Sequence, residues 1–162
     1  MRKIGIIAVL SLMALALAAV PAIAAAPNTG NAHFIKNATN ASVDQNSNLV
    51  VNFKETGLSS GSTETVQLTA TGTADYQCFN NGGKHPKAAN KETVSTLLST
   101  SGQFTADKSG NIVGSLTLAP PGPGTFTCPA GQTLVGPTNV SYTNIVLTDL
   151  TSLATISLGS AS

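Results

Sequence analysis

Apolar and polar residues alternate with a period of two along much of the chain, a pattern typical of half-buried β-strands. In 48–54, for example, Leu49, Val51 and Phe53 share one face. Segments rich in Gly, Asn, Asp and Ser, which favour turns, separate the alternating runs. We predict strands beginning near His33 and at 48–54, 63–71, 74–79, 92–105, 112–118, 125–128, 138–147 and 154–158.

Segment 92–105 fits two patterns. Val94 and Leu97 have helical spacing, and Asn90 is a candidate N-cap for a helix. The β-branched residues of the segment favour a strand instead, and we expect one long strand with a bulge near Gly102. The turn residues at 107–111 then predict an antiparallel hairpin between this strand and 112–118.

Eight or nine short strands with frequent turns predict an all-β fold, a single β-sandwich in an immunoglobulin-like Greek-key arrangement. A small barrel or a jelly roll is the alternative. The core Trp of immunoglobulin domains is missing. Tyr76 lies two residues before Cys78, the first cysteine, whereas the tyrosine corner precedes the second. The likeness is therefore one of architecture only.

Residues 1–24 have the three parts of a secretory signal peptide: basic Arg2 and Lys3, an apolar run, and small residues before a cut after Ala24. An uncleaved membrane anchor is the alternative. We expect a flexible tail at 25–32, a sandwich domain at 33–162, and no membrane span once the signal is cleaved.

Removal of the signal changes the charge. The whole chain has eight Lys and Arg against seven Asp and Glu, and Arg2 is its only arginine. Without Arg2 and Lys3 the chain carries a net charge of about −1 and lacks the guanidinium groups that dominate nucleic-acid recognition. No nucleic-acid partner is expected.

The chain has two cysteines, Cys78 and Cys128. In an exported protein they predict one disulfide, which stabilises a loop of this length by roughly 4 kcal/mol in the chain-entropy model. A metal pair or a catalytic thiol is the alternative, but neither cysteine has a neighbouring His or a CxxC partner.

Catalytic motifs are scarce. His33 and His85 belong to no metal-ligand pattern, so neither a metal nor a cofactor is expected. Five acids could form a carboxylate pair on paper: Glu64, Asp75, Glu92, Asp107 and Asp149. An enzyme is disfavoured. A small secreted enzyme, or an enzyme inhibitor presenting 119–124 or 80–91, is the alternative.

The loop 80–91 concentrates positive charge in Lys84, His85, Lys87 and Lys91. A basic, Gly-rich loop on a rigid sandwich is a candidate site for an anionic glycan, a cell-wall polymer or lipid head groups. The competing interpretation is a solvated connection whose lysines keep the surface soluble.

Outward faces rich in Thr, Ser and Asn also suit hydrogen bonding to carbohydrate, but such sites usually add an exposed ring. Phe34, Tyr76, Phe104 and Phe126 all fall at core positions, which disfavours a sugar-binding interpretation. Sequons at Asn37, Asn40 and Asn139 are expected by chance in a chain of this composition.

Five stretches carry a resemblance to other sequences: 76–78, 80–84, 88–91, 128–132 and 140–144. In these stretches the chain is similar to small exported bacterial proteins of unknown function, a resemblance that implies no activity, ligand or catalytic residue. We expect an exported, non-enzymatic sandwich that acts as an extracellular binding or structural module, with a cell-surface or extracellular polymer as its partner.

Overall fold

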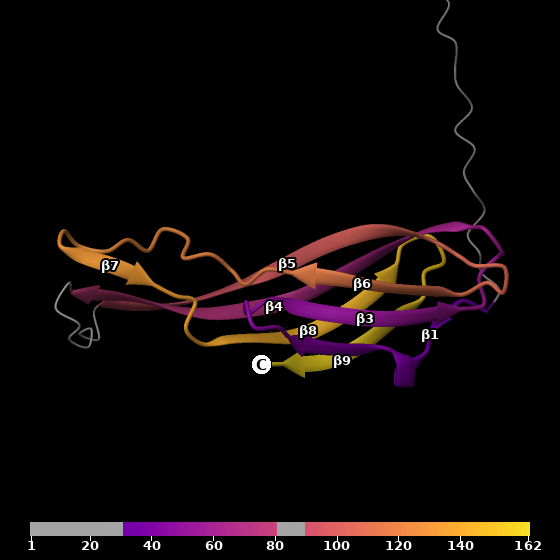
Figure 1. Ribbon diagram of the computed structural model, residues 1–162, viewed down its shortest axis with the longest axis horizontal. Helices are drawn as coiled ribbons and strands as arrows, with labels where there is room; N and C mark the ends of the chain where they lie inside the picture. Colours follow the sequence, from indigo (N-terminus) through magenta and orange to yellow (C-terminus); the bar gives the residue numbers. More distant parts are fainter. Residues whose placement is uncertain (1–30, 81–89) are drawn as a thin grey trace, which may run out of the picture.

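The computed structural model of the protein describes residues 31–80 and 90–162 (Figure 1). The predicted signal peptide at 1–24 lies outside these residues. The described residues contain no helix that is long and apolar enough to cross a membrane. They form a short 3-10 helix, η1 (Lys36–Ala38), and the strands β1 (His33–Phe34), β2 (Asn40–Val43), β3 (Leu49–Thr56), β4 (Thr63–Asn80), β5 (Lys91–Thr105), β6 (Ile112–Leu118), β7 (Gln132–Val135), β8 (Val140–Asp149) and β9 (Thr155–Ala161).

The strands form two antiparallel sheets that pack face to face, which confirms the β-sandwich (Figure 1). In the first sheet β3 pairs with β6 on one edge and with β1 and β2 on the other. In the second, β4 pairs with β5 on one edge and with β8 and β7 on the other, and β9 extends the sheet beyond β8. β3 and β4, which are consecutive in the chain, belong to different sheets, and β6 and β8 return from later in the chain to pair with them.

The core lies between the two sheets and follows from the alternation in the sequence. Every second residue of β4 from Glu64 to Cys78 is buried, and the residues between them are partly exposed. Phe53 of β3 stands at the centre of three rings. It meets Phe34 at 5.8 Å and Phe104 of the opposite sheet at 5.1 Å, both edge to face.

The predicted hairpin between 92–105 and 112–118 is wrong. Asp107 does organise the expected turn by accepting hydrogen bonds from the backbone N–H groups of Ser109 and Asn111. However, this turn carries the chain from one sheet to the other, and β6 pairs with β3 instead of β5. Local patterns predict the turn but not the strand with which β6 pairs, because the inward-facing residues of β6 can be buried beside any strand of the core.

Two further expectations about these strands also change. Segments 63–71 and 74–79 form one continuous strand, β4, because Gly72 marks close packing and not a break: a Cβ there would lie 2.6 Å from a methyl carbon of Leu98. The long strand predicted at 92–105 is confirmed as β5, but it pairs with β4 residue by residue without a bulge at Gly102.

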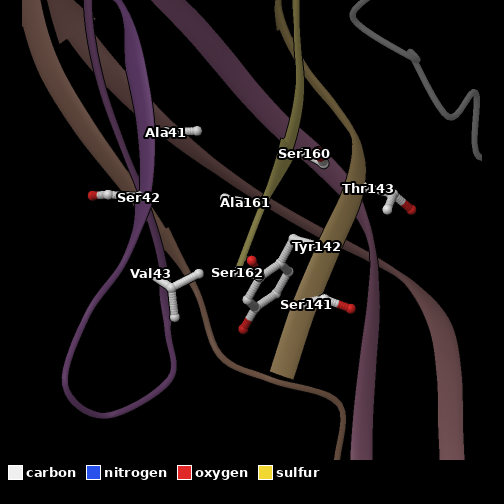
Figure 2. Close-up of a pocket in the computed structure, with 9 residues that line it drawn as sticks. All are labelled: Ala41, Ser42, Val43, Ser141, Tyr142, Thr143, Ser160, Ala161 and Ser162. Carbon is white, nitrogen blue, oxygen red and sulfur yellow. The ribbon is translucent and has the colours of Figure 1, made fainter. Parts of the chain in front are cut away.

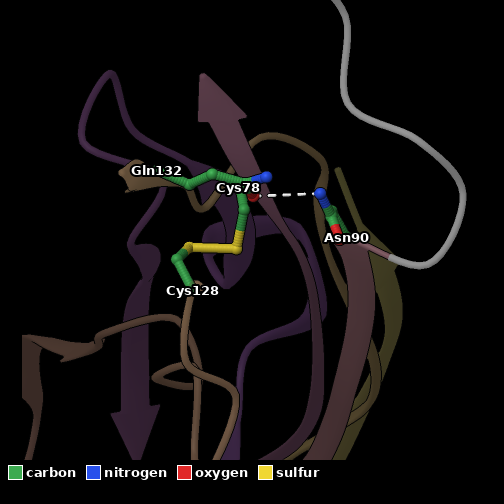
Figure 3. The surroundings of a disulfide bond; sticks show 4 residues. All are labelled: Cys78, Asn90, Cys128 and Gln132. Carbon is green, nitrogen blue, oxygen red and sulfur yellow. Dashed lines mark hydrogen bonds between the residues drawn. A yellow bond between two sulfur atoms is a disulfide. The ribbon is translucent and has the colours of Figure 1, made fainter. Parts of the chain in front are cut away.

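The far end of β4 extends beyond the first sheet and is covered by the segment between β6 and β7 (Figure 1). Tyr76 donates a hydrogen bond to the carbonyl oxygen of Pro121, and Cys78 forms the predicted disulfide with Cys128, with a Cα–Cα distance of 5.5 Å (Figure 3). The strand predicted at 125–128 is absent from this described segment, and Phe126 is only half-buried, outside the main core. The disulfide therefore pins a covering segment onto β4.

Candidate functional site

The outer face of the second sheet is a surface of hydroxyl and amide groups. Its partly exposed positions along β4 are Thr or Gln from Thr65 to Thr73, and Ser residues of β5 lie opposite several of them. The Oγ1 of Thr73 and the Oγ of Ser95, for instance, are 3.0 Å apart. A charged cluster, the Asp75 cluster, follows at the next position along β4.

The Asp75 cluster draws its side chains from β4, from β5 and from the residues that lead into β8. Thr93 donates a hydrogen bond to Oδ1 of Asp75, and the Nδ2 of Asn139 donates to Oδ2 at 2.8 Å. The backbone of Asp75 is also held, because its carbonyl accepts from the N–H of Thr138 at 2.9 Å and its N–H donates to the carbonyl of Asn139 at 3.2 Å. Hydrogen bonds therefore hold both the side chain and the backbone of Asp75 in place.

The electrostatics of the cluster keep the carboxyl group ionised. The hydrogen bonds from Thr93 and Asn139 lower the pKa of Asp75 below its usual value of 3.8, and the charge of Lys91 adds to the effect. Since Asp75 remains partly exposed, this fixed negative charge is available to a ligand.

Further donors surround the carboxylate. Lys91 lies opposite Gln77 in the strand pairing, and the Nε2 of Gln77 donates to the Oγ1 of Thr138 at 3.4 Å. Asp75 and Asn139 line two shallow cavities of about 200 and about 470 Å³. The alternation of β4 places the half-buried ring of Phe79 on this same face.

Of the four predicted loop residues, the structure describes only Lys91, which lies exposed at the start of β5, within reach of Asp75. Lys84, His85 and Lys87 lie outside the described residues. At the base of the loop, the Nδ2 of Asn90 donates to Oε1 of Gln132 at 2.9 Å, beside the disulfide (Figure 3).

A larger groove of about 650 Å³ lies between β2 and β9 (Figure 2). Small and hydroxyl-bearing residues such as Ser42, Ser141 and Ser160 line it. Its single ring, Tyr142, is fully buried and donates its hydroxyl hydrogen to the carbonyl of Ser47 at 2.7 Å. The groove therefore offers a ligand fewer kinds of interaction than the Asp75 cluster.

Two of the acids that could have formed a catalytic pair lie close together. Glu64 and Asp149 converge with Glu55, but all three side chains are fully buried and line none of these cavities. In the part of the chain that the structure describes, no three His, Cys, Asp or Glu side chains form a group that could hold a metal ion.

No motif in the sequence marks Asn139 and Thr93 as binding residues, and Asp75 stands out there only as one of the acids. A signal was present: in 73–77 every second residue is polar and capable of hydrogen bonding. Which residues lie beside them depends on the register between β4 and β5 and on the approach of 138–139, which local patterns do not encode.

The chain was also compared with known proteins. No protein-family model, curated protein or solved structure matches it.

Proposed function

We propose that this protein is an exported, extracellular binding module, and that the Asp75 cluster holds a polar glycan on the outer face of the second sheet. The observation that carries the proposal is the convergence of an ionised carboxylate, an amide and hydroxyl groups, with Lys91 beside them, on one partly exposed patch. Glycans are recognised by such mixed donors and acceptors because each sugar hydroxyl can both give and accept a hydrogen bond.

The hydrogen-bonding capacity of the cluster supports this class of ligand. A carboxylate has about four acceptor positions, and Asp75 uses two of them for Thr93 and Asn139. The remaining positions can accept from sugar hydroxyls, while Lys91 and Gln77 can donate. Because the cluster is built on strands, its groups are largely pre-organised and little side-chain freedom is lost on binding.

The local charge favours a neutral glycan over an anionic one. Lys91 lies diagonally across the strand pair from Asp75 and on the same face, whereas Glu92 is paired with the inward-facing Tyr76 and belongs to the other face. The described part of the cluster therefore has one positive and one negative group, which balance each other. A polyanion gains no net attraction from these two groups, whereas a neutral polymer exchanges hydrogen bonds with water for hydrogen bonds with the protein.

Phe79 strengthens the proposal. Sugar-binding sites usually pack a pyranose ring against an aromatic side chain. The sequence pattern directs Phe34, Tyr76, Phe104 and Phe126 to the core, so another ring is needed. Phe79 lies four residues after Asp75, on the same face of β4, and is half-buried. Four strand residues span about 13 Å, so Phe79 offers an apolar contact to a glycan of several sugar units that extends from Asp75 along β4.

Export is part of the proposal. The signal-like residues 1–24 direct the chain out of the cytoplasm, and the Cys78–Cys128 disulfide is stable in an oxidising compartment. The partner is then a polymer of the cell surface or of the extracellular medium.

Binding to insoluble polysaccharides tests the site. We expect the mature protein to sediment with at least one of cellulose, chitin and peptidoglycan, and the substitution Asp75→Ala to weaken that binding about tenfold or more, since charged hydrogen bonds contribute roughly 1.5–3 kcal/mol each. Lys91→Ala should weaken it several-fold. The matched control is Lys108→Ala, which removes an exposed lysine from the turn between β5 and β6.

The melting temperatures of these variants show whether the fold is kept. Wild-type binding by a folded Asp75→Ala protein, or equal losses for Lys91→Ala and Lys108→Ala, would refute the site. Failure of the wild type to bind any of the three polymers would contradict the glycan proposal.

A further inference from the structure

Three carboxyl groups lie together inside one end of the sandwich, and we name them the buried carboxyl cluster: Glu55, Glu64 and Asp149. Glu55 ends the inward face of β3, Glu64 begins that of β4, and Asp149 ends that of β8. The side chains of all three have no exposed surface. Three of the chain's seven acids are therefore removed from water at one place.

Each of these side chains has one satisfied oxygen and one without a partner. Ser152 donates to Oε1 of Glu55 at 3.1 Å, Ser62 donates to Oε1 of Glu64, and Oδ1 of Asp149 accepts from backbone N–H groups of the following turn. The other oxygen of each carboxyl group is buried and has no hydrogen-bond donor. Buried acceptors without donors are rare in folded proteins, so a donor is expected here.

Among the residues that the structure describes, none places a positive charge beside the cluster. The residues paired with it on neighbouring strands are apolar: Phe34 of β1 and Ile112 of β6 lie opposite Glu55, and Phe104 of β5 lies opposite Glu64. Within the described residues, the charges that act on Glu55 are those of Asp149 and Glu64, and both are negative.

The ionisable groups nearby on the same elements are directed elsewhere. The exposed ring of His33 in β1 lies 2.7 Å from the carbonyl oxygen of Asn31. Lys54 faces outward from β3 and acts on Asp107, which is exposed with Lys108 in the turn after β5. The loop 57–62 and the turn 150–154 contain no charged residue.

We propose that Glu55 carries a proton in the folded protein and donates it in a hydrogen bond to Asp149, and that this bond holds together the end of the sandwich formed by 57–62 and 150–154, so that the fold loosens as the pH rises. Ser152 joins the two carboxyl groups, because its hydroxyl donates to Oε1 of Glu55 at 3.1 Å and its N–H donates to Oδ1 of Asp149 at 3.3 Å. A proton on Glu55 converts one acceptor without a partner into a donor and gives the neighbouring carboxylate a hydrogen bond. This accounts for two of the three buried oxygens by a single proton.

The titration of Glu55 agrees with this arrangement. Burial raises its pKa from 4.5 to about 8, and the negative charge of Asp149 adds to the rise, while the hydrogen bond from Ser152 opposes it. Because the folded protein binds this proton more tightly than the unfolded chain, its contribution to stability is complete below about pH 4.5. That contribution is lost as the pH rises toward 8.

Three connections between strands lie at the cluster: the loop 57–62, the turn between β5 and β6, and the turn 150–154. The charge on the cluster therefore acts on all three connections. The N–H of Leu58 donates to the carbonyl of Gly110, and the N–H of Gly61 donates to that of Ala106. The N–H of Leu150 reaches the carbonyl of Thr65, next to Glu64. Ionisation of Glu55 places a second negative charge beside that of Asp149, and the repulsion between the two weakens these contacts.

Thermal unfolding of the mature protein tests the proposal without reference to any ligand. We expect the melting temperature, followed by circular dichroism because the chain lacks Trp, to fall by about 5 °C or more between pH 5 and pH 8. Glu55→Gln, which keeps the shape of the protonated side chain, should remove most of this dependence. The matched control is Glu92→Gln, a change at an exposed residue of β5, and it should retain the dependence.

A second measurement does not depend on the variant folding. With ¹³C-labelled glutamate only three side chains are observed, Glu55, Glu64 and Glu92, and the Glu55 carboxyl signal should titrate above pH 6.5. A Glu55 signal that titrates near pH 4.5 overturns the proposal, and so does a melting temperature that does not change between pH 5 and pH 8. If calcium chloride raises the melting temperature at pH 7 and EDTA reverses that rise, a cation and not a proton joins these oxygens, and the proposal is equally overturned.

Discussion

Single residues decide how closely the two sheets approach each other. Gly114 of β6 faces inward, and the ring edges of Phe53 and Phe104 occupy the space beside it. A Cβ at Gly114 would lie 2.6 Å from a ring carbon of Phe104 and 2.7 Å from one of Phe53. This glycine is therefore required by the three-ring contact at the centre of the core.

The substitution Gly114→Ala tests this packing. We expect it to lower the free energy of unfolding by about 1–3 kcal/mol, because two aromatic rings must leave their positions to admit one methyl group. Chemical denaturation measures the loss. Gly122→Ala is the control: its Cβ would meet nothing within 4 Å, so its free energy of unfolding should stay close to that of the wild type. Equal stability of the two variants would contradict the packing argument.

The position of Tyr142 is a feature of a single residue that the sequence pattern does not predict. It is the largest fully buried side chain, lies near the start of β8, and its hydroxyl is bonded to the turn before β3. It is no tyrosine corner, because its hydroxyl bonds to Ser47, 95 residues away in the chain, and not to backbone a few residues upstream. The sequence pattern drew attention to Tyr76 instead, because the proximity of Tyr142 to Ser47 depends on contacts between residues far apart in the chain.

Among the elements, the ribbon of β4 and β5 is unusual because it extends past the sheet that it packs against (Figure 1). Its far inner face would be exposed without the segment 119–131. Tyr76 and the disulfide hold that segment against β4, and Pro121 is a buried residue within it. The disulfide thus acts on one arm of the fold, whereas the core between the sheets is held by apolar packing.

Removal of the disulfide tests this division. We expect Cys78→Ala/Cys128→Ala to lower the free energy of unfolding by about 4 kcal/mol, the chain-entropy value for a loop of this length. In the folded variant, hydrogen exchange should quicken in 119–131 and in the far half of β4, with β3 and β6 unchanged. Dithiothreitol gives the control, because it should reproduce the effect in the wild type and have none on the variant. Uniformly faster exchange would show that the disulfide supports the whole core.

At the scale of the whole molecule, the distribution of ionisable groups separates two roles. The carboxyl group of Asp75 is partly exposed and held ionised on the outer face of the second sheet, where a ligand can reach it. Glu55 is buried near the end of β3, beside the start of β4 and far from Asp75, and its pKa is raised. Binding and pH response can therefore be tested independently of each other.

The protein recovered from the culture medium provides a test of export. We expect its intact mass to correspond to a chain that begins at Ala25 and lacks two hydrogen atoms relative to the reduced form, because the signal has been removed and the disulfide has formed. Reduction should restore those two hydrogens. A mass that includes residues 1–24 would contradict cleavage, and a mass at the reduced value would contradict an oxidised pair outside the cell.

The sequence by itself determined most of the strands, most of the core and the disulfide, but not β2, β7 or the absence of a strand at 125–128. Alternation identified Leu49, Val51 and Phe53 as one buried face, since the two sides of a strand meet different environments and select different residues. Two cysteines in a chain with a secretory pattern left one intramolecular partner for each. These properties are local, or depend on composition, and so they can be read without the fold.

The tertiary structure alone decided the pairing of β6 with β3, the convergence of Asp75 with Thr93 and Asn139, and the burial of three acids together. Glu55, Glu64 and Asp149 each continue an apolar face by one position, which a pattern can show. That these positions meet depends on which strands face each other across the sandwich. Any inward face can pack against any other, so the choice among partners is made by the energy of the whole core.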